Sequence, residues 1–546
     1  MSAELFETAK AWRDQDPDDT TRAELDALII AAEAGDTEPL AERFSSRLAF
    51  GTAGLRGELG AGPTRMNRVL VTQAAAGLAA YLLSKSPAPS IVIGYDGRTN
   101  SEVFARDSAV IMAGAGVRTT LLPRMLPTPV LAFAVRHFDA SAGVMVTASH
   151  NPARDNGYKV YLGELDHGSQ IVAPADGEIA EAIARVATVS IETLPRSTDF
   201  VVADDSVLNE YVRRTAALGN SPAAISSVYS AMHGVGWETS ELVFGAAGFE
   251  TPEVVSEQIA PDATFPTVAF PNPEEPGAMD LTLAKAVEVG ADIAIVNDPD
   301  ADRLAVAIPT PAGWRALSGN EIGMLLGWRA AQRCGADGVL AASIVSSPAL
   351  GQIARSYDLD YVETLTGFKW ISRVEGLSFG FEEALGYLGD PEKVSDEDGI
   401  SAAVDMLSLA SELKAAGKTM LDHLDDFADK FGAYASGQIS VRVKDLAEIP
   451  GLMAKLRSAP PAKVGAQSVA SIDDFIDGFG EFPPGDILRF HFDNGARVIV
   501  RPSGTEPKLK AYIDASSTDG DATTRQATAA AIVADLDTGM RALLGI

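Results

Sequence analysis

Apolar residues recur along this chain in two alternating patterns. Residues 69–85, 101–116 and 318–332 have the composition and spacing of helices, whereas 90–96, 291–296 and 304–309 are short apolar runs typical of strands. Segments that alternate in this way predict α/β domains. The first 48 residues show only helical periodicity, with Leu25, Leu28, Ile29 and Ala32 on one face.

The chain is too long for one hydrophobic core. Its 546 residues favour three or four domains. We expect a helical extension at 1–48, α/β domains at 49–200, 201–312 and 313–430, and a last domain at 431–546. Strand-like segments dominate this last part, and Asp493-Asn494-Gly495 between two apolar runs predicts a hairpin.

The composition and net charge of the chain argue against some classes of binding partner. The net charge of −31 and the pI near 4.5 argue against broad binding to nucleic acid or anionic membranes, so an anionic ligand would need a few local cations. No apolar run approaches the length of a membrane span, and we expect a cytoplasmic protein. The single cysteine, Cys334, excludes an internal disulfide and is given no catalytic role.

A serine stands out in the stretch VMVTASHNPARDNGYKVY, residues 144–161. Ser149 lies on a predicted turn between strand-like runs at 144–147 and 158–161, where we expect it to be exposed. Such a hydroxyl can act as a nucleophile or phosphoryl carrier if cations and a base lie nearby. Considered alone, the segment is better explained as an ordinary turn.

Three carboxylates occupy alternate positions between two strand-like runs, at Asp298, Asp300 and Asp302. They would repel one another unless a hard cation such as Mg²⁺ neutralised them. An EF-hand is excluded, because Arg303 and Pro309 replace its glycine and glutamate. A dehalogenase-type phosphatase motif stays open as a weaker alternative, since Leu304 replaces its Thr or Val. Arg303 suits a site that faces phosphate.

Further segments carry candidate ligand-binding groups. Glycines surround Arg56 and Arg65 in residues 50–67, Gly367 and Lys369 lie in the TGFKW segment, and the pair Glu382 and Glu383 follows a strand-like run. Glutamates can accept hydrogen bonds from sugar hydroxyls, although paired glutamates also occur at solvated helix starts. The segment RPSGTEPKLK suits a phosphate dianion through backbone amides, hydroxyls and cations, at Arg501, Ser503, Gly504, Thr505, Lys508 and Lys510.

Four of these motifs together resemble the α-D-phosphohexomutase superfamily. They are TASHNP at 147–152, DPDADR at 298–303, FEEALG at 381–386 and RPSGTEPK at 501–508. The resemblance covers nearly all of the chain after Arg43. The segments FGTAGLRG, SGNEIG and GFEEALGY most resemble those of the branch that contains phosphopentomutase-like enzymes and bacterial phosphoglucomutases or phosphomannomutases.

The resemblance implies a fold and a site. The fold would have three related α/β domains with mixed sheets and a smaller C-terminal α+β domain around a central cleft. Ser149 would be the phosphoserine and would hold one Mg²⁺ together with Asp298, Asp300 and Asp302. His150, Lys159 and Arg56 would act near the transferring group. Substrate would be bound by Arg303, Gly367, Lys369, Glu382, Ala384, Arg501, Ser503, Gly504, Thr505 and Lys508.

The implied reaction interconverts sugar 1-phosphates and 6-phosphates through a phosphoserine and a sugar bisphosphate. Glucose is the first expected substrate, mannose and pentose phosphates are alternatives, and a non-catalytic phosphosugar-binding protein is an alternative of another class. Partners would be phosphosugars, without nucleic acid or membrane, and the protein a monomer or homodimer. Ala384 replaces a serine of many relatives, and Glu397 replaces a lysine proposed for proton transfer, which makes Lys159 or His150 the better acid/base candidate.

Overall fold

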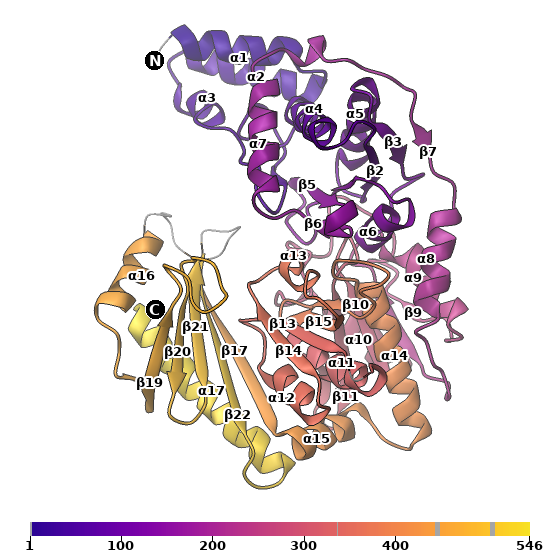
Figure 1. Ribbon diagram of the computed structural model, residues 1–546, viewed down its shortest axis with the longest axis vertical. Coiled ribbons are helices and arrows are strands. Elements are labelled where there is room, and N and C mark those ends of the chain that lie inside the picture. Colours follow the sequence, from indigo (N-terminus) through magenta and orange to yellow (C-terminus); the bar gives the residue numbers. More distant parts are fainter. Residues whose placement is uncertain (1–2, 336, 443–447, 503–507) are drawn as a thin grey trace. The chain divides into compact units, whose positions relative to one another are not determined.

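The computed structural model describes residues 3–335, 337–442, 448–502 and 508–546 of the chain (Figure 1). These residues form two compact units. The first unit contains Met1–Leu317 and Gly386–Glu412, and the second contains Ser318–Leu385 and Leu413–Ile546.

Three helices open the first unit. Asp18 caps the second of them by accepting a hydrogen bond from the backbone N–H of Thr20, as expected for an aspartate at a helix start. Leu25, Ile29 and Ala32 are buried as predicted, while Leu28 is only partly buried against the same cluster. The helices are α1 (Ala3–Gln15), α2 (Asp19–Glu33) and α3 (Glu38–Arg43).

A seven-stranded mixed sheet follows, with the order β1-β5-β4-β2-β3-β7 and β6 paired with β5. Its strands are β1 (Leu55–Glu58), β2 (Ser90–Tyr95), β3 (Arg118–Leu121), β4 (Ala142–Val146), β5 (Asp155–Leu162), β6 (Ser169–Gln170) and β7 (Val201–Val202). Its helices are α4 (Arg68–Lys85), α5 (Ser101–Gly114), α6 (Thr128–His137), α7 (Ala175–Val186), η1 (Glu164–Asp166) and η2 (Ile191–Thr193). Apolar residues of α4, α5 and α7 pack on the sheet in one core (Figure 1).

The order in which parallel strands are added changes side at β2. The strand after β2, β3, lies on one side of it, and the next strand, β4, lies on the other side. Because such parallel crossovers are right-handed, α5 and α6 cover opposite faces. The topological switch point of the sheet therefore lies at the carboxyl ends of β2 and β4, which is where ligands bind in open α/β sheets.

The second sheet repeats this topology. It is mixed, with the order β12-β11-β10-β8-β9, and β8 lies between its parallel neighbours β9 and β10. The strands are β8 (Ser227–Ser230), β9 (Glu253–Val254), β10 (Ile293–Asn297), β11 (Leu304–Thr310) and β12 (Gly313–Ala316). The helices are α8 (Ser206–Ala216), α9 (Gly236–Ala246) and α10 (Asp280–Val289). The later segment of this unit contains β16 (Gly386–Leu388) and the start of α14 (Gly399–Ala415).

The second unit begins with the same arrangement a third time. β13 lies between its parallel neighbours β14 and β15. The elements are β13 (Val339–Ser343), β14 (Asp360–Thr364), β15 (Leu377–Glu382), α11 (Gly319–Arg333), α12 (Ala349–Ser356), α13 (Phe368–Ile371) and α15 (Met420–Phe431). The three sheets thus share the order of their three central parallel strands, although they differ in the number of strands.

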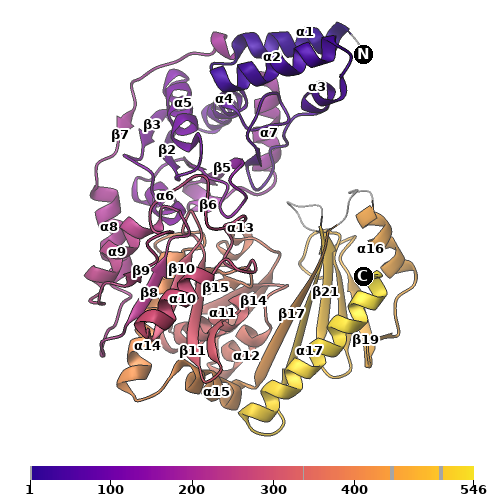
Figure 2. The ribbon, with the colours of Figure 1, turned by 180° about the vertical axis from the view of Figure 1, so that it is seen from behind.

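The C-terminal part of the second unit is different, because its six strands are antiparallel in the order β17-β22-β21-β20-β19-β18. The helix α17 runs along one face of this sheet (Figure 2). The predicted hairpin at Asp493-Asn494-Gly495 is confirmed between β20 and β21. The elements are β17 (Ala433–Arg442), β18 (Lys463–Val464), β19 (Gln467–Asp474), β20 (Leu488–Phe492), β21 (Arg497–Pro502), β22 (Lys508–Ser517), α16 (Glu448–Ser458) and α17 (Ala522–Leu544).

The predicted fold class is confirmed, with α/β sheets of shared topology followed by an antiparallel α+β part. The domain boundaries proposed from sequence stay predictions. No helix in the described ranges is long and apolar enough to cross a membrane.

Candidate active site

The turn that carries Ser149 joins the antiparallel strands β4 and β5 at the carboxyl end of β4. Ser149 has a φ of 51°, an uncommon value for a residue with a side chain. Its backbone N–H donates to the Thr147 hydroxyl at 2.8 Å, which helps to fix this conformation. The expectation of an exposed serine was wrong, since Ser149 is only 2% exposed. Neighbouring loops enclose the turn, as described next.

Arg98 holds the turn in place, although sequence reasoning did not include it among the site residues. It follows β2, and its guanidinium donates hydrogen bonds to the backbone carbonyls of Ser149 at 2.6 Å and Asn151 at 2.6 Å. Two further carbonyls accept at 2.9 and 3.2 Å, those of Pro152 and Asp155. Its one signal in the sequence was the polar segment Gly97-Arg98-Thr99-Asn100 after a strand-like run, because the residues that follow the parallel strands β2 and β4 lie at the same edge of the sheet.

The Ser149 hydroxyl lies between a carboxylate and an imidazole. Its Oγ is 3.2 Å from Asp298 Oδ2 and 3.0 Å from His150 Nδ1. Burial lowers the pKa of His150 well below its ordinary value, and the charges of Arg303 and Arg56 lower it further, so the imidazole is neutral. A neutral imidazole at this distance can exchange a proton with the hydroxyl.

The three aspartates form one buried cluster in the loop between β10 and β11. Asp298, Asp300 and Asp302 are each 0% exposed, and their ligand oxygens all lie within 4.8 Å of one another. One oxygen each of Asp300 and Asp302, the Oδ1 atoms, is buried without a hydrogen-bond partner among the described residues. Buried carboxylate oxygens without donors fit a hard cation, so the residues present suit a divalent metal ion.

Burial and the neighbouring carboxylates shift the pKa values of the three aspartates. Burial raises the pKa of Asp298 well above its ordinary value, and the charges of Asp302 and Asp300 raise it further. Burial and the charge of Asp300 raise the pKa of Asp302 to about 6. Burial also acts to raise the pKa of Asp300, but Lys159 and the Thr128 hydroxyl bring it below its ordinary value.

Two neighbours stabilise the charge on Asp300. Lys159 Nζ on β5 lies 3.1 Å from Asp300 Oδ2 and forms a second ion pair with Asp302 Oδ2 at 2.5 Å. Burial acts to lower the pKa of Lys159, but these carboxylates raise it above its ordinary value, so the ammonium is protonated. Thr128, at the start of α6, donates its hydroxyl to Asp300 Oδ2 at 2.6 Å. Nothing in the sequence marked Thr128 as part of this site.

Arg56 and Arg303 add positive charge. Arg56 on β1 donates to the Asn151 side-chain oxygen at 3.4 Å, on the serine turn. The backbone N–H of Arg303 donates to Asp298 Oδ1 at 3.0 Å. Burial acts to lower the pKa of Arg303, but Glu397 and two of the cluster's aspartates, Asp302 and Asp298, raise it above its ordinary value. The carboxylate of Glu397 thus stabilises the charged form of Arg303.

The second unit holds the remaining described candidates. Glu382, the last residue of β15, accepts a hydrogen bond from the backbone N–H of Gly367 at 2.7 Å. Arg501 on β21 donates to the hydroxyl of Thr366 at 2.7 Å, so the segment at 366–367 contacts both side chains. The alternative of a helix start at the glutamates is wrong, since a turn follows β15.

The other candidates of this unit take separate positions. Lys369 belongs to the short helix α13 rather than to a loop, and Ala384 lies in the turn after β15. Lys508 begins β22. Ser503, Gly504 and Thr505 lie outside the described residues. The structure therefore brings together Ser149, the aspartates, Lys159 and His150 in one unit, and Gly367, Glu382 and Arg501 in the other.

Four family models match the chain in order. They are the phosphoglucomutase/phosphomannomutase alpha/beta/alpha domains I at 47–189, II at 209–313 and III at 318–431, and the C-terminal domain at 439–531.

Relatives of similar length carry three different names. A probable phosphomannomutase of Haemophilus influenzae is 56% identical over 482 residues, which cover 88% of this chain and 98% of the relative. A phosphopentomutase of Mus musculus is 35% identical over 582 residues, with 95% and 92% covered. A phosphoglucomutase of Staphylococcus aureus is 33% identical over 510 residues, with 88% and 92% covered.

Solved structures share the fold. A putative phosphomannomutase from Thermus thermophilus superposes with a TM-score of 0.70 at 23% identity, covering 92% of this chain and 100% of that one. A phosphoglucomutase from Paramecium, in an open form, gives a TM-score of 0.69 at 17% identity, covering 92% and 96%.

Proposed function

Because the chain belongs to the phosphoglucomutase/phosphomannomutase family of intramolecular phosphotransferases, we propose that it interconverts hexose 1-phosphates and 6-phosphates with Ser149 as the phosphoryl carrier. The observation that carries this proposal is the distance of 3.2 Å between Ser149 Oγ and Asp298 in the three-aspartate cluster. A serine hydroxyl beside a divalent-cation site is suited to phosphoryl transfer.

In the first half-reaction the phosphorus–oxygen bond at Ser149 breaks while a bond from phosphorus to a sugar hydroxyl oxygen forms, and in the second half-reaction the same changes run in reverse at the other end of the sugar. The sugar hydroxyl releases a proton, and Ser149 Oγ takes one up. His150 Nδ1 lies 3.0 Å from Oγ and exchanges the proton there. Lys159 is protonated among the carboxylates and cannot accept the proton of the sugar hydroxyl, so its ammonium group stabilises the charge that develops on the sugar oxygen while the neutral imidazole of His150 accepts the proton. The bisphosphate then turns and returns its other phosphate to Ser149.

We propose that the cation is Mg²⁺ and that it would be held by Asp298, Asp300, Asp302 and the Ser149 phosphoryl group. Carboxylate oxygens are hard ligands of the kind that Mg²⁺ prefers, and the bound ion would neutralise charge on the transferred oxygens. Arg98 keeps the serine turn in place through its four bonds to backbone carbonyls.

The rest of the substrate would be bound by residues of the second unit. Glu382 would accept hydrogen bonds from sugar hydroxyls, with Gly367, Lys369 and Ala384 beside the ring. Arg501 would hold the non-reacting phosphate together with Ser503, Gly504, Thr505 and Lys508. Arg303 and Arg56 would face the transferring phosphate.

Two hexoses are proposed as substrates. Glucose was the first expectation, and the relative named a probable phosphomannomutase gives mannose equal support at 56% identity. A phosphopentomutase activity is a second candidate, supported by the match at 35% identity over 95% of the chain.

The decisive experiment measures phosphate on Ser149. Intact mass of the purified protein, before and after incubation with glucose 1,6-bisphosphate and Mg²⁺, should show one added phosphoryl group per chain. Turnover of glucose, mannose and ribose 1-phosphates, assayed side by side, then ranks the sugars.

The matched variants are Ser149→Ala and Ser84→Ala, the latter an exposed serine on α4. Ser149→Ala should lose both the added mass and the turnover, and Ser84→Ala should keep both. Normal turnover of Ser149→Ala would refute the proposal. Net release of inorganic phosphate without an added mass would favour a phosphatase, and binding of phosphosugar without either would favour a non-catalytic binding protein.

A further inference from the structure

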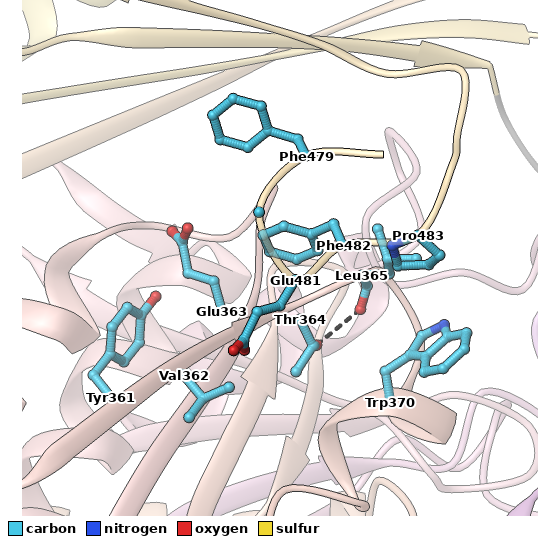
Figure 3. Close-up of a pocket in the computed structure, with 11 residues that line it drawn as sticks. Tyr361, Val362, Glu363, Thr364, Leu365, Trp370, Phe479, Glu481, Phe482 and Pro483 are labelled. Carbon is cyan, nitrogen blue, oxygen red and sulfur yellow. Dashed lines mark hydrogen bonds between the residues drawn. The ribbon is translucent and has the colours of Figure 1, made fainter. Parts of the chain in front are cut away.

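A pocket of about 620 Å³ lies in the second unit, between β14 and the loop that joins β19 to β20 (Figure 3). A pocket of this volume can hold a small organic molecule. Leu365 lines it, but Gly367, Lys369, Glu382 and Arg501 do not. It is therefore distinct from the candidate substrate groups.

One wall of the pocket is aromatic and rigidly supported. The buried Phe475 contacts Phe479 and Phe482, with ring centroids 5.2 and 5.5 Å apart. Phe479 and Phe482 also exchange both backbone hydrogen bonds, at 3.1 and 2.9 Å, across a two-residue turn. Gly480 takes a φ of 58° in this turn, which a glycine adopts without strain. The turn places Glu481 at its tip.

The opposite side is formed by β14 and α13. Trp370 contributes a partly buried indole, and the strand contributes Tyr361, Val362 and Thr364. In Figure 3 the side chain of Glu481 points from the turn towards the strand that carries Val362 and Thr364. Aromatic rings thus flank a carboxylate.

One of the two carboxylates that line the pocket is left without a cationic partner among the described residues. Glu363 is already paired, with Arg497 at 2.9 Å and Arg489 at 3.3 Å. Glu481 is exposed and has no ion-pair partner within the described ranges. No lysine or arginine is among the described residues that line the pocket. A cation that enters the pocket would therefore find an unneutralised carboxylate.

A cation already lies against this aromatic wall. The guanidinium carbon of Arg489 is 5.6 Å from the centroid of the Phe479 ring and 5.4 Å from that of Phe475. Ring faces carry partial negative charge, and a positive charge near them is stabilised, most strongly when it is desolvated. Phe479 and Phe482 line the pocket beside Glu481, so a cation bound there would lie near the same rings.

We propose that this pocket is a binding site for an aromatic amine, a ligand whose planar ring packs among Trp370, Phe479 and Phe482 while its ammonium group pairs with Glu481. The proposal uses contacts of the second unit alone and does not depend on the reaction proposed above.

The test compares three probes that share one ring and differ in charge. Phenethylammonium is positive, 2-phenylethanol is neutral and 3-phenylpropionate is negative. Each is titrated into the full-length protein by calorimetry or ligand-observed NMR. We expect the ammonium probe to bind about tenfold more tightly than the alcohol, as an aromatic and carboxylate site for a cation predicts, and the carboxylate probe to bind most weakly.

Two variants locate the site. Glu481→Gln removes the carboxylate from the pocket, and Asp477→Asn removes the same charge from an exposed position of the same loop outside it. Glu481→Gln should lose the preference for the ammonium probe, and Asp477→Asn should keep it. The proposal is overturned if the three probes bind equally, if none binds at concentrations up to about 10 mM, or if Glu481→Gln retains the preference.

Discussion

Replacing Arg98 by lysine tests how the serine turn is held in place. The guanidinium donates four hydrogen bonds, at 2.6 to 3.2 Å, to backbone carbonyls of residues 149, 151, 152 and 155, and its side chain is 1% exposed. Lysine keeps the positive charge but has one compact ammonium group, which cannot span the positions that the planar guanidinium reaches. Arg98→Lys therefore separates hydrogen-bond geometry from charge.

The expected loss follows from the number of bonds. A hydrogen bond with a charged donor contributes about 1.5–3 kcal/mol, so a lysine that keeps two of the four bonds loses about 3–6 kcal/mol before the turn relaxes. We expect a net loss near the lower end, about 3 kcal/mol. At about 2.1 cal/mol/K of unfolding entropy per residue, a unit of about 340 residues would melt about 4 °C lower. Displacement of Ser149 should also lower mutase turnover about 100-fold.

The assay pairs thermal unfolding with turnover of glucose 1-phosphate. Arg106→Lys is the matched control, because Arg106 on α5 pairs with Glu102 at 2.9 Å and both side chains are about half exposed, 52% and 53%. Such a surface pair contributes at most about 0.5 kcal/mol. If Arg98→Lys melts within about 2 °C of the unmodified protein and turns over normally, Arg98 does not hold the turn.

Two further substitutions probe the aspartate loop. Thr128→Val removes the hydroxyl that bonds Asp300 at 2.6 Å and should weaken Mg²⁺ binding about tenfold in a calorimetric titration; unchanged affinity would contradict this role. Gly234→Ala would bring a Cβ to 2.2 Å from the Pro299 backbone and should destabilise the first unit by about 1–3 kcal/mol. Gly245→Ala on α9, which meets nothing within 4 Å, should instead be neutral or stabilising, and equal melting shifts for the two would refute the packing argument.

Sequence alone predicted the features that depend on local pattern. Helical periodicity and apolar runs gave the alternating elements, because burial imposes those periods on any chain. The three aspartates were predicted as a metal site, and their ligand oxygens do converge, because one short loop between two strands carries all of them. The hairpin at Asn494-Gly495 was likewise encoded by adjacent residues.

The tertiary structure decided what depends on distant residues. Ser149 is buried rather than exposed, because loops from distant parts of the sequence pack against it. Arg98 is 51 positions away and Asp298 is 149 positions away, and both contact Ser149. Thr128 reaches Asp300 across 172 positions. Hydrogen bonds from a side chain to backbone carbonyls cannot be recognised in the sequence of the accepting residues, because every residue type has a carbonyl. The order in which distant strands pair in each sheet therefore determines which side chains come together at the site.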